Sequence, residues 1–108
     1  MAKVLPFRKA AQKARNISAH DALQMIKALA QDSRCVFVVP HAKHRQFSRR
    51  VSRRLIMTCL RKGRITEGPF MNIHGNWQVN VSRHAAGEDV TCVVAIEWDR
   101  QLIVVTVF

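Results

Sequence analysis

A histidine and two arginines recur four residues apart in the middle of the chain. On a helix, His41, Arg45 and Arg49 would lie along one stripe that drifts by about 40° at each step. A histidine can act as a general acid or base near neutral pH, and neighbouring arginines can stabilise the extra charge of a phosphoryl-transfer transition state. RNA carries its own nucleophile, the 2′-hydroxyl, so this set could support RNA cleavage without a metal ion.

The same spacing is also compatible with a purely structural role. His41 follows Pro40 and could cap the helix or bind a carbonyl, while the arginines could grip phosphates or brace a sheet. The other histidines are scattered without the spacing of metal ligands, and the glycines form no phosphate-binding loop. The sequence therefore predicts no metal and no cofactor, and it leaves catalysis and simple binding both open.

Positive charge is concentrated in the same region. The 108-residue chain has a net charge of +11, with 18 Lys and Arg against 7 Asp and Glu. No acidic residue lies between Asp32 and Glu67, so a helix there cannot form ion pairs along its own surface. Because guanidinium groups suit bidentate contact with phosphate, we expect this segment to bind RNA or DNA. Besides the stripe, the expected contacts are Lys43, Arg50, Arg53, Arg54, Arg61, Lys62 and Arg64.

Solubility alone and membrane binding both fit this charge pattern less well than nucleic-acid binding does. A solvated face that only keeps a protein soluble normally mixes both signs of charge. A membrane surface is not expected, because the arginine-rich helix lacks an opposite face rich in Trp or Phe. No segment approaches the roughly 20 apolar residues of a membrane-spanning helix. An acidic protein partner stays open as the alternative to nucleic acid.

Helical patterns precede a β-sheet in this sequence and would position the stripe. Apolar residues at helical spacing predict a helix over 19–31, and the β-branched run 36–39 predicts a short strand. The segment 41–62 predicts two helices separated by a turn, with Ser52 near the cap of the second. Gly63 is expected to end that helix in left-handed geometry.

From residue 64 the apolar pattern changes from the helical period to alternation. Strands are predicted over 65–68, 77–81, 90–96 and 102–108. Short connections between consecutive strands imply antiparallel pairing. We therefore expect an α+β fold in which N-terminal helices pack on one face of a four-stranded, mainly antiparallel sheet.

The chain length fits a single domain. Residues 1–16 are basic without acids and predict an arm that is mobile unless bound, which leaves 17–108 as one α+β domain. Cys35, Cys59 and Cys92 have neither disulfide-framework nor zinc-site spacing. They are expected to be small buried residues of a protein that resides in the reducing cytoplasm.

Motifs spread over several elements carry a family resemblance. The run His41-Ala42-x-x-Arg45-x-x-x-Arg49-x-Val51-Ser52 is followed by Leu60-x-x-Gly63-x-Ile65. The pattern continues with Gly75-x-Trp77, Val93-Val94-Ala95-Ile96 and the closing Ile103-Val104-Val105-Thr106-Val107. Over about residues 36 to 108, the chain resembles the bacterial family catalogued as "domain of unknown function four-two-five-eight".

That family resembles the RelE and ParE-like toxins, which are grouped more widely with barnase-like and colicin-type ribonucleases. The resemblance implies helices packed on a curled antiparallel sheet and the activity of a metal-independent endoribonuclease, or at least binding of nucleic acid or a partner. A toxin of this kind would also need an acidic antitoxin-like protein as its partner. The positions that match the family pattern are His41, Arg45, Arg49 and Thr106, the last as an accessory polar group.

One position departs from the family pattern. The family usually has Gly after the second motif arginine, and this chain has Arg50. A turn that prefers Gly must then be made by an ordinary residue, or the two helices run together.

Overall fold

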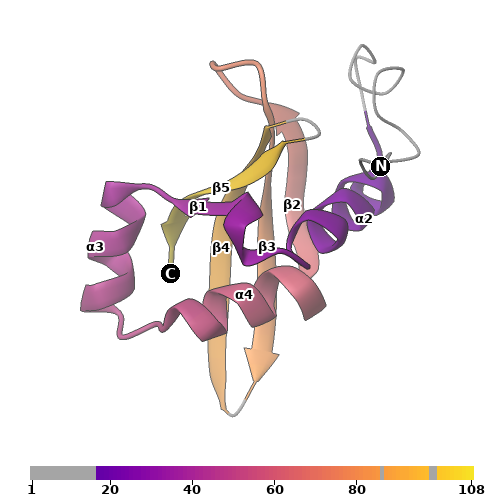
Figure 1. Ribbon diagram of the computed structural model, residues 1–108. Helices are drawn as coiled ribbons and strands as arrows, with labels where there is room; N and C mark the ends of the chain where they lie inside the picture. Colours follow the sequence, from indigo (N-terminus) through magenta and orange to yellow (C-terminus); the bar gives the residue numbers. More distant parts are fainter. Residues whose placement is uncertain (1–16, 86, 98–99) are drawn as a thin grey trace.

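The computed structural model describes residues 17–85, 87–97 and 100–108, and the predicted basic arm lies outside these ranges. Its helices are α2 (Ala19–Leu29), α3 (Pro40–Ser48) and α4 (Arg53–Lys62), with a short 3₁₀ helix, η1 (Ser33–Cys35). Its strands are β1 (Val36–Val38), β2 (Arg64–Met71), β3 (Trp77–Ala85), β4 (Glu88–Glu97) and β5 (Gln101–Val107). This arrangement, shown in Figure 1, is an α+β fold, as predicted.

The described strands form one open, mixed sheet with the order β1-β5-β4-β3-β2. Strands β2 to β5 form the expected antiparallel meander. The prediction of four strands was wrong, because β1 joins the edge of the sheet, where it pairs in parallel with β5. Val36 pairs with Leu102 and Val38 with Val104, so this strand depends on partners that local sequence patterns do not reveal.

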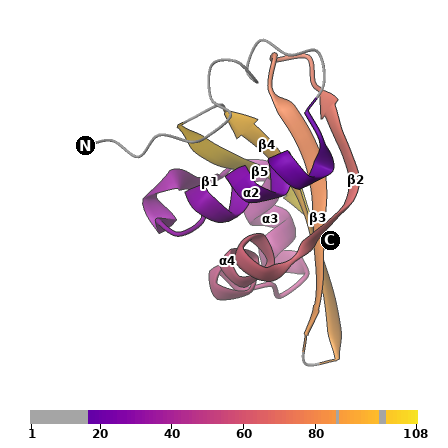
Figure 2. The ribbon, with the colours of Figure 1, turned by 90° about the vertical axis from the view of Figure 1, so that its right-hand side faces the viewer.

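The three helices lie on one side of the twisted sheet, as Figure 2 shows. Side chains that alternate along the strands meet the helices in the core, among them Val79, Val81 and Val94, all fully buried. Helix α2 contributes Met25 and Ile26 to the same core. It ends at Leu29, two residues earlier than predicted, because the chain turns at Ala30. The packing confirms that one sheet face carries the hydrophobic core.

Helices α3 and α4 are separate, and a single tight turn joins them. Arg50 makes that turn with a positive φ of 58°, a conformation that a side chain at Cβ disfavours. Ser52 caps α4 as predicted, and its side-chain oxygen accepts a hydrogen bond from the Leu55 N–H at 3.0 Å. An ordinary residue therefore makes the turn for which the family favours Gly.

Gly63 ends helix α4 for a different reason from the one predicted. Its φ is −77° with ψ −175°, so it is extended rather than left-handed. A β-carbon at this position would lie 2.7 Å from the Ser82 carbonyl oxygen, and it would also collide with the Cys59 carbonyl. Glycine is needed here because the end of α4 approaches the backbone of β3 so closely.

Two of the predicted strands extend beyond their expected ends. Strand β2 runs on to Met71 rather than ending near Gly68, since irregular pairing around Gly68, at φ 91°, lets the strand continue past Pro69. Strand β3 continues to Ala85, and its last residues pair with the first residues of β4. The extra length carries the paired ends of β3 and β4 beyond helix α4, which runs across these strands (Figure 1).

The cysteines are free, and two of them are buried as predicted. Cys59 and Cys92 are fully buried, whereas Cys35 is half-buried. A hydrogen bond with Cys59 and burial both raise the pKa of the Cys92 thiol well above its ordinary value. Within the described residues no helix is long and apolar enough to cross a membrane.

Candidate nucleic-acid interface

Helix α3 presents its functional candidates on two flanks. Ala42 is fully buried, and Arg45 and Gln46 are half-buried, so these residues mark the face turned towards the protein. At 100° per residue, His41 falls on the Arg45 flank of this face and Lys43 on the Gln46 flank. His41 and Lys43 therefore point to different surroundings.

The first flank meets the C-terminal end of β5, which lies beside α3 in Figure 1. Arg45 Nε donates a hydrogen bond to the Val107 carbonyl at 3.4 Å. Thr106, the neighbour of Val107 in β5, is half-buried and pairs with Val93. The structure thus brings one motif arginine next to the strand end that carries the motif threonine.

The other two motif residues stay apart from this contact. His41 is exposed, and within the described residues its side chain makes no hydrogen bond. Arg49 is exposed at the C-cap of α3, where its N–H bonds to the Arg45 carbonyl at 2.9 Å. A separation of eight helical residues places His41 and Arg49 about 12 Å apart along the axis. The four motif residues therefore form an elongated strip rather than a compact cluster.

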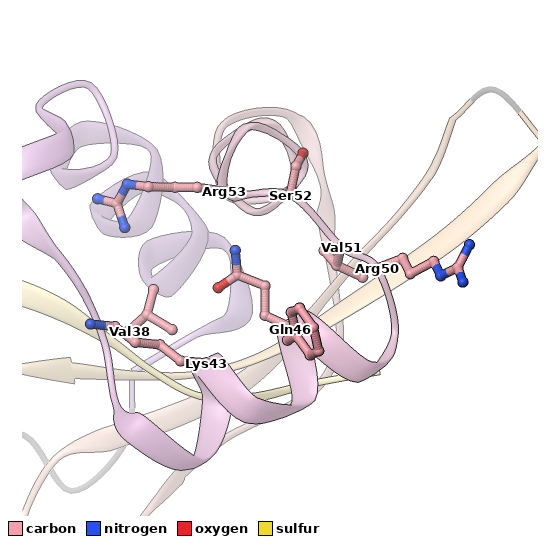
Figure 3. Close-up of a pocket in the computed structure, with 8 residues that line it drawn as sticks. Val38, Lys43, Gln46, Arg50, Val51, Ser52 and Arg53 are labelled. Carbon is pink, nitrogen blue, oxygen red and sulfur yellow. The ribbon is translucent and has the colours of Figure 1, made fainter.

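A groove of about 700 Å³ opens on the second flank, between α3, β1 and the start of α4. Val38 and Val51 contribute buried apolar surface to it, and Lys43 and Arg53 contribute positive charge. In Figure 3, Lys43 and Arg53 extend to the same side, whereas Arg50 points the opposite way. Phe47, which is 85% exposed, also lines the groove.

Two of the predicted binding arginines hold the fold together instead of pointing freely into solvent. Arg53 Nη2 donates to the carbonyls of Ser33 at 2.9 Å and Val36 at 3.2 Å. Arg61 Nε donates to the Ala30 carbonyl at 2.7 Å, beyond the end of α2. Carbonyls at a helix C-terminus, such as that of Ala30, lack partners within their own helix, so a cationic donor there stabilises the junction.

The remaining predicted cations are exposed and uncompensated. In the described part of the chain, the ion pairs join Arg34 to Asp32, His84 to Asp89 and Arg100 to Glu97. None of them involves the α3–α4 region, and within the described residues no side-chain hydrogen bond occupies its exposed cations other than Arg53 and Arg61. We call the others the α3–α4 cationic surface: Lys43, Arg49, Arg50, Arg54 and Lys62. Arg64 is also exposed, but it lies on β2 and is not part of this surface.

Sequence reasoning missed part of this region. The groove residues Lys43, Gln46, Phe47 and Arg50 follow the spacing i, i+3, i+4, i+7, a signal that was present in the sequence. The carbonyl partners of Arg53 and Arg61 lie 17 to 31 residues away, and no local pattern indicates them. Among the residues that the structure covers, no three His, Cys, Asp or Glu side chains gather as metal ligands would.

Comparison with known proteins gives one match. A family model described as "Domain of unknown function (DUF4258)" matches residues 38–108, from the end of β1 through the whole meander. No curated protein and no solved structure matches the chain.

Proposed function

The chain belongs to the DUF4258 family, and we propose that this member is an RNA-binding protein that uses its α3–α4 cationic surface. The observation that carries the proposal is the set of exposed cations without acidic partners in that region. Uncompensated charge of one sign repels itself in the folded protein, and a polyanion relieves that repulsion. Phosphate contacts release counterions and supply most of the affinity for nucleic acid.

Phe47 favours single-stranded RNA over duplex DNA as the ligand. A large aromatic side chain that is 85% exposed beside Lys43 and Arg50 offers a surface for stacking of an unpaired base. A base within a duplex is already stacked on its neighbours and gains nothing from it. The resemblance to RelE and ParE-like ribonucleases also supports RNA as the ligand. We propose in addition that the chain is related to the RelE-like toxins and that it acts in the cytoplasm.

The binding proposal is tested by fluorescence anisotropy with a single-stranded oligoribonucleotide at several salt concentrations. We expect log K to fall with log salt at a slope of about −0.7 per phosphate contacted. Lys43→Gln and Arg54→Gln should each weaken binding on the order of tenfold. Arg34→Gln removes the same charge from an ion-paired residue and serves as the control. Affinity that is independent of salt, or equal losses in all three variants, would refute the proposal.

The choice of RNA is tested separately through the aromatic side chain. Phe47→Ala should weaken binding of single-stranded RNA by about tenfold and leave duplex DNA binding unchanged. Phe70→Ala is the control, because Phe70 is likewise an exposed phenylalanine, at 48%, but lies on β2, away from α3. Equal effects of Phe47→Ala on RNA and on duplex DNA would remove the argument for unpaired bases.

RNA cleavage is a second candidate function, supported by the contact of Arg45 with the end of β5. His41 would take the proton of the 2′-hydroxyl while its oxygen bonds to phosphorus and the bond to the 5′-oxygen breaks. Water protonates the departing 5′-oxygen, and the imidazolium returns its proton to the hydroxide that results. Arg45 and Arg49 would stabilise the phosphate charge, with Thr106 as an accessory polar group.

Cleavage is tested by incubating the purified protein with RNA in EDTA and analysing the ends of the products. The mechanism predicts 2′,3′-cyclic phosphate and 5′-hydroxyl ends. His41→Ala should slow cleavage at least a hundredfold, roughly the contribution of a general acid or base. His74→Ala, in an exposed loop position, is the control. A wild-type protein that leaves RNA intact in varied buffers would count decisively against this function.

An acidic antitoxin-like protein is the remaining candidate partner. The groove beside α3 combines the apolar surface of Val38 and Val51 with the positive charge of Lys43 and Arg53. This combination suits a segment that carries both apolar and acidic side chains. Co-purification from the native host distinguishes the two partners: recovery of an acidic protein without nucleic acid would favour this alternative over RNA binding.

A further inference from the structure

A row of hydroxyl groups crosses three strands on the sheet face that points away from the helices. Val81 is fully buried in the core, so Ser82, the next residue of β3, faces the opposite side. Ser82 Oγ lies 2.8 Å from Thr91 Oγ1 on β4 and 3.4 Å from Thr66 Oγ1 on β2. Hydroxyl groups both donate and accept, so such a row can offer hydrogens to an anion.

Arg64 stands beside this row. It pairs with Ser82 in the register of β2 and β3, and its exposed side chain makes no hydrogen bond or ion pair with the described residues. Arg83 follows Ser82 in β3 and therefore faces the helix side, as Val81 does, so its buried Nε does not point towards the hydroxyl row. Arg64 is thus the arginine that a ligand on this row would meet.

Together these residues line a groove of about 240 Å³ on β2, β3 and β4. Asp89 is the one acid among its lining residues, and its carboxylate accepts from His84 Nδ1, so part of its charge is already paired. The groove volume is several times that of one water molecule, roughly 30 Å³. A phosphate group therefore has room to enter, and the unpaired charge that it meets there is that of Arg64.

We propose that this groove binds a phosphate group. Its oxygens would accept hydrogen bonds from the Arg64 guanidinium and the hydroxyl row. The phosphate could come from the backbone of an RNA strand, which rests on the proposed function, or from a free phosphate. Sequence reasoning assigned only Arg64 to binding, although Asn80 and Ser82 flank the buried Val81 and so mark a polar face of β3.

The groove is tested by following backbone amide signals in NMR spectra of the whole protein. Inorganic phosphate and a short oligoribonucleotide are titrated separately, and the amides of residues 64, 82, 83 and 91 are monitored. Arg64→Gln should weaken the response to phosphate on the order of tenfold. Arg100→Gln is the matched control, since it removes the same charge near the far end of β4, about 20 Å along the strand from Thr91.

The outcomes separate the groove from the α3–α4 cationic surface. Responses to both ligands that weaken in Arg64→Gln but not in Arg100→Gln support a phosphate site that RNA also uses. A response to phosphate alone supports the site with a free phosphate as its ligand. If RNA binding does not depend on Lys43 or Arg54, the proposed function fails. The response to inorganic phosphate still shows whether the groove binds a phosphate group. No response to either ligand at these four amides would overturn the inference.

Discussion

Arg50 combines backbone strain and unpaired charge in a single residue. Its φ of 58° is a conformation that costs an L-residue about 1–2 kcal/mol, and its exposed side chain extends to the side opposite Lys43 and Arg53. Nothing in the packing of the turn requires the arginine side chain, since Gly would adopt the same backbone without strain. The charge is therefore the feature that distinguishes Arg50 from the glycine usual in the family.

We predict that Arg50→Gly raises the free energy of unfolding by about 0.5–1 kcal/mol. Relief of the strain outweighs the extra entropy that Gly gives to the unfolded chain, which is about 0.4–1 kcal/mol. Urea denaturation measures the change. Arg49→Gly is the matched control, because Arg49 has φ −92° and gains nothing from Gly. A variant Arg50→Gly no more stable than Arg49→Gly would contradict the strain argument.

Residue identities alone could not separate binding arginines from structural ones. The acid-free stretch predicted a cationic region, and the exposed Lys43, Arg49 and Arg54 agree with it. Arg53 and Arg61 have the same chemistry, but carbonyl groups reached through the fold occupy them. The stripe from His41 to Arg49 follows from helical spacing, whereas the contact of Arg45 with Val107 depends on how α3 packs on β5.

At the scale of elements, two reciprocal side-chain hydrogen bonds join helices α2 and α4. Arg61 Nε donates to the Ala30 carbonyl at 2.7 Å, and Lys27 Nζ donates to the Arg61 carbonyl at 3.2 Å. Each helix thus supplies a cation to an unpaired carbonyl at or just beyond the other helix's end. The favourable interaction of cations with helix C-termini adds to both contacts.

We predict that Arg61→Ala lowers the free energy of unfolding by about 1 kcal/mol, because the Ala30 carbonyl loses a charged donor. Arg54→Ala, on the same helix, should change it by less than about 0.5 kcal/mol, since the Arg54 side chain makes no hydrogen bond with the described residues. Thermal or urea denaturation of both variants provides the measurement. Equal losses would show that the hydrogen bond to Ala30 contributes nothing specific.

Local patterns predicted the elements better than their pairing. The helical period located α2, α3 and α4, and alternation located the meander strands. The parallel pairing of β1 with β5 joins residues 66 positions apart, and nothing within either strand specifies it. Gly63 was correctly placed at a helix end, but its cause is the approach of β3, which only the folded arrangement reveals.

At the scale of the whole molecule, the surplus of 18 basic over 7 acidic residues should make stability depend on salt. Screening weakens the repulsion within the α3–α4 cationic surface as ionic strength rises. We predict that Tm increases by about 4 °C between low salt and 0.3 M NaCl, which corresponds to about 1 kcal/mol. Differential scanning calorimetry in matched buffers measures it. A constant or falling Tm would mean that the exposed cations do not destabilise the fold.

The two outer strands of the sheet that the described residues form affect how the protein behaves at high concentration. Strand β2 forms one edge, where irregular pairing and Pro69, which has no N–H to donate, interrupt the row of peptide groups. Strand β1 forms the other edge and spans just Val36–Val38. Neither edge offers a long, regular template, so one molecule cannot readily extend its sheet onto another. The chain is thereby protected against edge-to-edge aggregation into fibrils, even when bound polyanion has neutralised the charge that keeps its copies apart.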